Sequence, residues 1–269
     1  MSQYHRSLNL DVARGSAIVF MAVFHFWYYL SRLFDWSFRY DDPKVFLLRL
    51  LVMTLFLGCA GIGLALQAKR GYRWPSFLKR TGLLGICALF ISVASYMFVP
   101  NNWIYFGILQ FLFVSTFVGV LFSFIPKISL VMGILIITGH FFVTGQIFST
   151  ISEYLISTYN ISNLQYYFSF QFLFNFLQPY LNLPKYTFDI SYFVPWFGLV
   201  LIGIFIGSLP YKLPSLPNIA IFKILAIMGR HALPMYFIHA IALAPIALGI
   251  EWMVNGNQST AMQLINSLF

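Results

Sequence analysis

The first long apolar segment of the chain contains three ionisable side chains of different chemistry. They are the carboxylic acid of Asp11, the guanidinium of Arg14 and the imidazole of His25. Such groups are costly inside a membrane, where they usually face protein or water and serve a function. An imidazole exchanges protons near neutral pH, and we therefore expect proton transfer at His25.

The spacing of these residues places them along one side of a helix. Arg14 and His25 are 11 residues apart. This is close to three whole turns, so both lie on one face, about 16 Å apart along the axis. Asp11 precedes Arg14 by one turn and can form an ion pair with it. Two alternative interpretations have no catalytic role. In the first, the ion pair only anchors the helix end at the membrane interface. In the second, His25 is an interior histidine that is hydrogen-bonded to a carbonyl.

Two later stretches supply polar groups that we expect at the same depth as His25. Gln110 lies in the outer half of a predicted span, and Asp189 precedes another span from the same side. A carboxylate and an amide beside an imidazole can orient and activate it. The predicted catalytic residues are His25, Asp11, Gln110 and Asp189. In the alternative interpretation, Asp189 only caps a helix N-terminus.

Aromatic and imidazole side chains at this depth are candidates for contact with a substrate. The predicted contacts are Trp196, Tyr28 and His239. Tyr28 follows His25 by one turn, and His239 follows Tyr236 by one turn in the last apolar segment. The alternatives are a structural role for His239 and an interfacial position for Trp196.

Basic side chains at the predicted cytoplasmic ends can bind an anionic nucleotide or phosphate group. The predicted cofactor-binding residues are Arg14, Arg80, Arg230 and His231. The alternative is the general excess of basic residues on the cytoplasmic side of membrane proteins. No metal is expected, because Cys59 and Cys87 have no ligand-spaced neighbours; we predict free, buried thiols.

The composition is that of an integral membrane protein. Of 269 residues, 60% are hydrophobic and 9% are charged, whereas a soluble domain carries about 25% charged residues. The 16 basic residues cluster at the ends of apolar segments, a placement that sets membrane orientation and does not indicate nucleic-acid binding. The first apolar run is typical of an uncleaved anchor.

Seven apolar stretches reach the length of about 20 residues that spans a bilayer. They lie at about 10–33, 45–68, 81–99, 103–125, 128–147, 191–209 and 232–250. The basic loop from Lys69 to Arg80 contains no acid, which places it and the N-terminus in the cytoplasm. The sequence therefore predicts an all-α, polytopic helical bundle of seven to eight spans, forming a single domain over residues 1–269.

Two segments do not fit this simple pattern. Residues 148–190 are rich in aromatic residues, and they contain either an interfacial or re-entrant segment or an eighth span. The stretch from Asn218 to Met228 is mostly apolar but short. We expect it to be a helix that breaks near Gly229 before the final span.

Four motifs occur in the order found in a known family. They are Leu10-Asp11-Val12-Ala13-Arg14-Gly15 with Phe24-His25; Tyr105-Phe106-Gly107-Ile108-Leu109-Gln110; Asp189 with Val194-Pro195-Trp196-Phe197-Gly198; and Gly229-Arg230-His231 with Leu233, Tyr236 and His239. With these motifs the chain resembles bacterial heparan-alpha-glucosaminide N-acetyltransferase-like membrane proteins. Its opening is also similar to that of the integral-membrane acyltransferase family 3.

The resemblance implies a multi-pass enzyme of the bacterial inner membrane. Such an enzyme moves an acyl group, commonly acetyl, from cytoplasmic acyl-CoA to a hydroxyl or amine of a glycan or small sugar on the far side. The resemblance also implies a catalytic histidine near the acceptor side, and His25 matches this position as a general base or a covalent acyl carrier. The chain departs from the pattern at Gln110, where many bacterial members have histidine.

Two other functions are compatible with the sequence. The first is a proton-coupled transporter or flippase of a lipid-linked sugar or anionic solute, with the side chains of the first span as a proton relay. The absence of an internal repeat speaks against it, because many transporters are built from repeats. The second is a non-catalytic membrane subunit. A homodimer is compatible with each of these functions.

Overall fold

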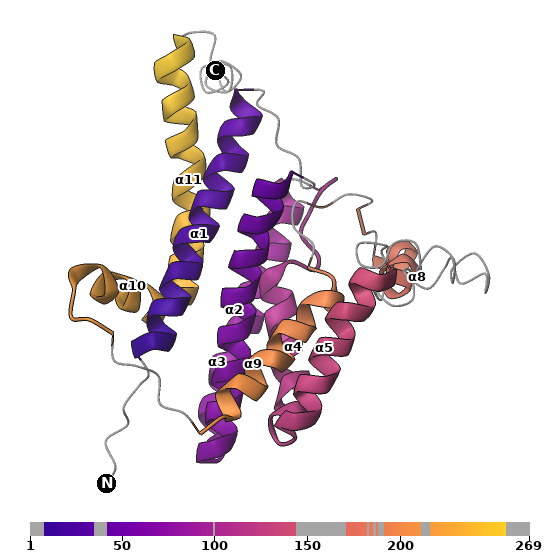
Figure 1. Cartoon of the computed structure of the whole chain (residues 1–269). Coiled ribbons are helices and arrows are strands. Elements are labelled where there is room, and N and C mark those ends of the chain that lie inside the picture. Colours follow the sequence, from indigo (N-terminus) through magenta and orange to yellow (C-terminus); the bar gives the residue numbers. More distant parts are fainter. Residues whose placement is uncertain are drawn as a thin grey trace. The chain divides into compact units, whose positions relative to one another are not determined.

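The computed structural model describes residues 8–34, 42–98, 100–143, 171–181, 183–184, 187, 191–210 and 216–256. The regular elements within these ranges are all helices, which confirms the predicted all-α class. Figure 1 labels these helices. They group into two compact units. Unit 1 consists of Met1–Phe56 and Lys212–Phe269, and unit 2 consists of Leu57–Tyr211. The single domain over residues 1–269 stays a prediction.

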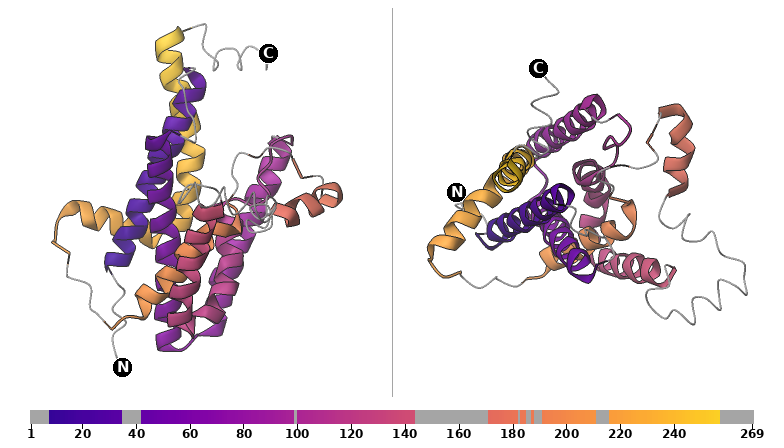
Figure 2. Two further views of the ribbon diagram at one scale, coloured as in Figure 1. Left: turned by 45° about the vertical axis from the view of Figure 1, so that its right-hand side comes forward. Right: turned by 90° about the horizontal axis from the view of Figure 1, so that it is seen from above.

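Unit 1 is built on the first helix, α1 (Leu8–Leu33), and on a bent pair of helices from the end of the chain. This pair consists of α10 (Ala220–Arg230) and α11 (Ala232–Asn255). Both pack against α1, and α11 runs along it (Figure 2). The chain bends by 92° between α10 and the start of α11. The predicted break near Gly229 is therefore confirmed, one to two residues further along the chain.

Unit 2 contains the shorter apolar helices. After the unit boundary inside α2 (Pro43–Arg70) come α3 (Trp74–Phe98), α4 (Ile108–Ser123), α5 (Pro126–Val143), α8 (Gln171–Leu181) and α9 (Phe193–Ser208). α5 and α4 pack on α9, and α3 packs on α4. Phe111, Leu201 and Ile204 are completely buried in this core.

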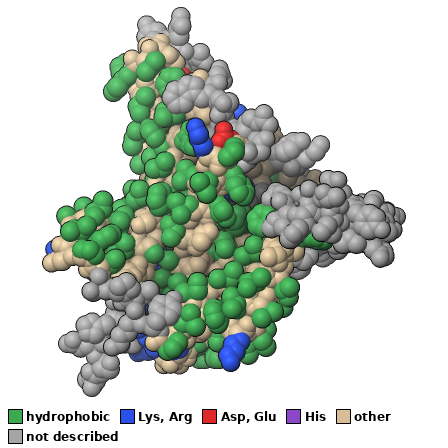
Figure 3. Space-filling view, viewed as in Figure 1, with side chains coloured by type: hydrophobic (Ala, Val, Ile, Leu, Met, Phe, Trp, Pro, Cys, Tyr) green, Lys and Arg blue, Asp and Glu red, His purple; other side chains and the backbone are tan. Residues whose placement is uncertain are grey.

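Among the described residues, three helices are long and apolar enough to cross a membrane. They are α1, α2 and Trp74–Met97 of α3, and the bent pair α10–α11 is a fourth if it is counted as one span. The apolar helices α4, α5 and α9 coincide with predicted spans, and α4 and α9 are shorter than the predicted stretches. Apolar side chains are spread widely over the described part of the face seen in Figure 3, as is typical of a membrane protein. Seven to eight spans and a cytoplasmic N-terminus stay predictions.

Two local expectations are corrected. The predicted basic loop from Lys69 to Arg80 is largely helical, because α2 continues to Arg70 and α3 begins at Trp74. Gly71 ends α2 with a φ of 75°, a conformation that glycine adopts without strain. Cys87 is only partly buried, whereas the free thiol of Cys59 is buried as expected.

Two glycines bring the backbones of α1 and α10 into direct contact. A Cβ atom on Gly15 of α1 would fall on the carbonyl of Leu225 in α10. A Cβ atom on Gly229 of α10 would fall on the carbonyl of Asp11 in α1. Small residues permit such close approach between helices in membranes. The crossing of α1 and α10 therefore depends on the absence of side chains at both positions.

We expect Gly229→Ala to lower the thermal stability of the purified protein. The added methyl group must push α10 away from α1, and overpacking of this kind costs about 1–3 kcal/mol. Gly249→Ala in α11 is the matched control, because a Cβ atom there meets nothing within 4 Å. The measurement is the midpoint of thermal unfolding in detergent. Equal midpoints for the two variants would contradict the close contact.

Candidate functional site

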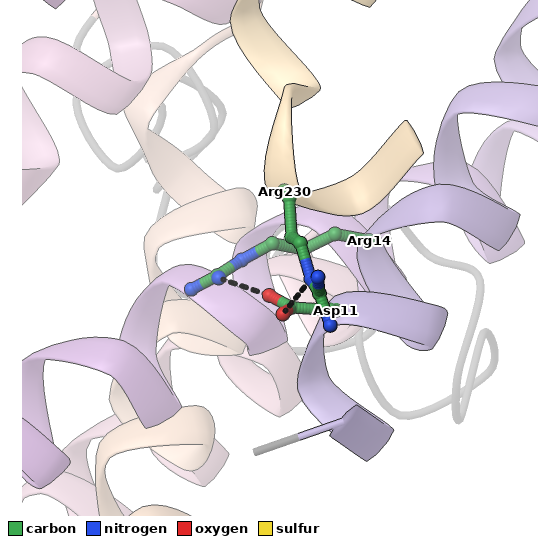
Figure 4. A network of polar contacts seen from close by, with 3 residues as sticks. All are labelled: Asp11, Arg14 and Arg230. Atoms are coloured by element: carbon green, nitrogen blue, oxygen red, sulfur yellow. Dashed lines mark ion pairs between the residues drawn. The ribbon is translucent and has the colours of Figure 1, made fainter. Parts of the chain in front are cut away.

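A buried carboxylate in α1 contacts two arginines from different parts of the sequence (Figure 4). The side chain of Asp11 is 1% exposed. Its Oδ1 lies 3.6 Å from Nη1 of Arg14, one turn further along α1, which confirms the predicted ion pair. Its Oδ2 lies 3.4 Å from Nε of Arg230, the last residue of α10. We call these three residues the arginine cluster.

The arginine cluster carries an excess of positive charge at a partly open position. Two guanidinium groups face one carboxylate, which leaves one net positive charge. The side chains of Arg14 and Arg230 are 28% and 49% exposed. Guanidinium groups bind phosphate through several parallel hydrogen bonds. His231 follows Arg230 directly at the bend and is also exposed.

A second cluster lies further along α1, where two imidazoles meet. Nε2 of His239 in α11 is 3.3 Å from Nδ1 of His25 in α1. The same Nδ1 of His25 is 3.0 Å from the carbonyl oxygen of Met21. Nδ1 of His239 is 3.3 Å from the carbonyl oxygen of Met235. His239 is buried, and His25 is partly buried.

The two carbonyl contacts favour one tautomer of each ring in this histidine pair. A carbonyl oxygen only accepts hydrogen bonds, so each contact is a hydrogen bond in the form that carries its proton on Nδ1. Nε2 of His239 then has a free electron pair and accepts from Nδ1 of His25. The proton of that Nδ1 is shared between His239 and the Met21 carbonyl. In this tautomer Nε2 of His25 carries no proton and can serve as a base.

Both clusters belong to unit 1 and use the same helices. α1 carries Arg14 and His25, and the rise of a helix separates their backbones by about 16 Å. The bent pair supplies Arg230 beside the first cluster and His239 beside the second. Among the predicted site residues, the structure thus brings Asp11, Arg14 and Arg230 together, and His25 and His239 together.

Other predicted site residues are not joined to these clusters. Gln110 lies in the first turn of α4, in unit 2, where its amide donates to the Ala88 carbonyl and the Ser92 hydroxyl at 3.0 and 2.7 Å. The amide nitrogen thereby joins α4 to α3, and the catalytic role of Gln110 stays a prediction. Arg80 is exposed on α3, and Trp196 is partly buried on α9.

Tyr28 and Asp189 are the remaining two predicted site residues. Tyr28 lies on α1, one turn beyond His25, and its ring meets that of Tyr29, with a centroid separation of 6.0 Å. Asp189 lies outside the described residues.

Sequence reasoning missed two features of the site. It predicted that His239 contacts the substrate, and it did not predict the contact between His239 and His25. These two residues are 214 positions apart in the sequence. It also missed the close crossing of α1 and α10. A signal for that crossing was present, since both cluster arginines stand next to the glycines that permit it, in Arg14-Gly15 and Gly229-Arg230.

The apolar helices and the two clusters define a helical membrane protein with two arginines on one buried carboxylate and a paired imidazole. A sequence model described as heparan-alpha-glucosaminide N-acetyltransferase, catalytic, matches residues 6–241, and the chain belongs to this family. The match confirms the resemblance carried by the four motifs and indicates an N-acetyltransferase. No curated protein and no solved structure matches the chain.

We expect Asp11→Asn to loosen α10 from α1. The neutral amide keeps the size of the side chain but leaves the two arginines to repel each other across the helix crossing. The measurement is hydrogen–deuterium exchange of the backbone amides in Ala220–Arg230, which should become faster. Lys223→Gln, which removes an exposed charge from the same helix, is the control. Equal exchange in the two variants would show that Asp11 does not hold α10.

Proposed function

We propose that this protein transfers the acetyl group of acetyl-CoA across the membrane to an amino or hydroxyl group of a sugar. Family membership supports the acetyl transfer. The observation that carries the proposal for this chain is that α1 joins an arginine cluster to a paired imidazole in one compact unit. The first cluster suits the phosphates of the donor, and the second suits proton transfer at its acetyl end.

The donor binds with its phosphate groups at the arginine cluster. Arg14 and Arg230 supply guanidinium groups that are held by Asp11 and still partly exposed. The basic residues near this end of the predicted spans favour a cytoplasmic location, where coenzyme A is found. The separation of the two clusters along α1 is comparable to the length of the pantetheine arm. This arm would follow α1 and bring the thioester to His25.

His25 acts as the general base of the transfer. Its unprotonated Nε2 takes the proton of the acceptor's amine or hydroxyl as that group attacks the thioester carbonyl carbon. The tetrahedral intermediate then collapses, the carbon–sulfur bond breaks, and the sulfur of coenzyme A leaves. The imidazolium of His25 returns its proton to that sulfur. The products are the acetylated sugar and free coenzyme A.

We expect His25→Ala to reduce transfer to a small residual rate in the purified, reconstituted protein. Loss of a general base typically lowers the rate about 10²–10⁴-fold. The assay supplies acetyl-CoA with glucosamine as the probe acceptor and measures both the release of free thiol and the mass of the acetylated sugar. His140→Ala in α5 is the matched control, because His140 belongs to unit 2 and to neither cluster. Near-normal transfer by His25→Ala would refute the role of this histidine.

We expect Arg230→Gln to raise the KM for acetyl-CoA by about ten-fold, the scale of one lost hydrogen bond to a charged group. Acetyl-pantetheine lacks the nucleotide and its phosphates, so its KM should not change. Lys223→Gln removes a basic side chain from the same helix outside the cluster and should leave both KM values unaltered. An equal effect of Arg230→Gln on the two donors would show that this arginine does not bind the phosphates.

A further inference from the structure

We propose that His239 is the positioning residue of His25, which it holds in the tautomer and orientation that leave Nε2 free to accept a proton. This inference rests on the proposed function. In this proposal His239 acts on the general base, His25. The sequence had predicted that His239 contacts the substrate. The observations that carry it are the contact between the two rings and the two carbonyls behind them.

The first argument concerns the tautomer. A neutral imidazole carries its proton on either nitrogen, and only one form presents Nε2 as a base. The Met21 carbonyl, 3.0 Å away, and Nε2 of His239, 3.3 Å away, both accept from Nδ1 of His25. Two acceptors at one nitrogen favour the form that is protonated there. In many enzymes a carboxylate orients the catalytic imidazole in this way; here a second imidazole takes that position.

The second argument concerns charge during the reaction. When Nε2 of His25 takes up a proton, its ring becomes positively charged, and the hydrogen bond from Nδ1 to His239 becomes charge-assisted and stronger. His239 therefore stabilises the transition state more than the ground state, which raises kcat and not substrate affinity. A neutral partner does this without placing a second buried charge in the membrane.

The third argument is that His239 is itself held in place. Its Nδ1 donates to the Met235 carbonyl, one turn earlier in α11. The ring of Tyr236 lies edge-on against it, with a centroid separation of 5.3 Å. His239 is also buried, with 8% of its surface exposed. These contacts fix its Nε2 toward His25 and leave it little access to a bound sugar.

The test compares His239→Leu with His239→Gln. Leucine has no acceptor, whereas the glutamine side chain reaches a position near that of Nε2 and carries an oxygen that accepts a hydrogen bond. We expect His239→Leu to lower kcat about 10- to 100-fold, the scale for loss of a residue that orients a functional histidine, with unchanged KM for acetyl-CoA. His239→Gln should recover most of this loss. In a His25→Ala background, His239→Leu should cause no further loss, because it acts through His25.

Three results would overturn the proposal. The first is a decrease in kcat in His239→Gln as large as in His239→Leu. The second is a raised KM for acetyl-CoA with unchanged kcat in His239→Leu. The third is a further decrease in the rate when His239→Leu is added to His25→Ala. A readout independent of transfer is nitrogen NMR of the histidine rings in the wild-type protein. We expect Nδ1 of His25 to be protonated and Nε2 of His239 to be unprotonated. The opposite protonation of these nitrogens would refute the positioning role, even if the protein transfers acetyl groups. The expected protonation in a protein that transfers no acetyl group would refute only the proposed function.

Discussion

The buried carboxylate of Asp11 is the constraint on which unit 1 depends. A charge that is 1% exposed among apolar helices must be compensated, and Asp11 is compensated by Arg14 and Arg230. Since Arg230 ends α10, this ion pair fixes the bend between α10 and α11 against α1. The bend in turn sets the start of α11, and with it the height at which His239 meets His25. One electrostatic requirement thus organises both clusters.

The sequence predicted the parts of this site that depend on local spacing. The ion pair of Asp11 with Arg14 follows from their separation by one helical turn, and the glycine indicated the break before the last helix. Neither the contact of Arg230 with Asp11 nor that of His239 with His25 could be predicted in this way. Both join segments more than two hundred residues apart, and helical periodicity contains no information on which distant helix a face meets.

Hydropathy also overestimated the length of α4 and α9. The predicted span at 103–125 begins with an apolar stretch that precedes α4, which starts only at Ile108. Hydropathy measures apolar character, and it does not distinguish a helix from an extended apolar segment that leads into it. Gln110 shows a related limit, because an amide in an apolar helix can serve catalysis or packing. Its hydrogen bonds to Ala88 and Ser92 favour packing, and only the fold could reveal those partners.

The central claim is that one helix carries both ends of the donor site. The most direct test is an experimental structure of the protein with a non-hydrolysable thioether analogue of acetyl-CoA. We expect its phosphates within hydrogen-bond distance of Arg14 and Arg230 and its carbonyl carbon adjacent to Nε2 of His25. Phosphates bound at Arg80, or an acetyl end remote from His25, would contradict the account.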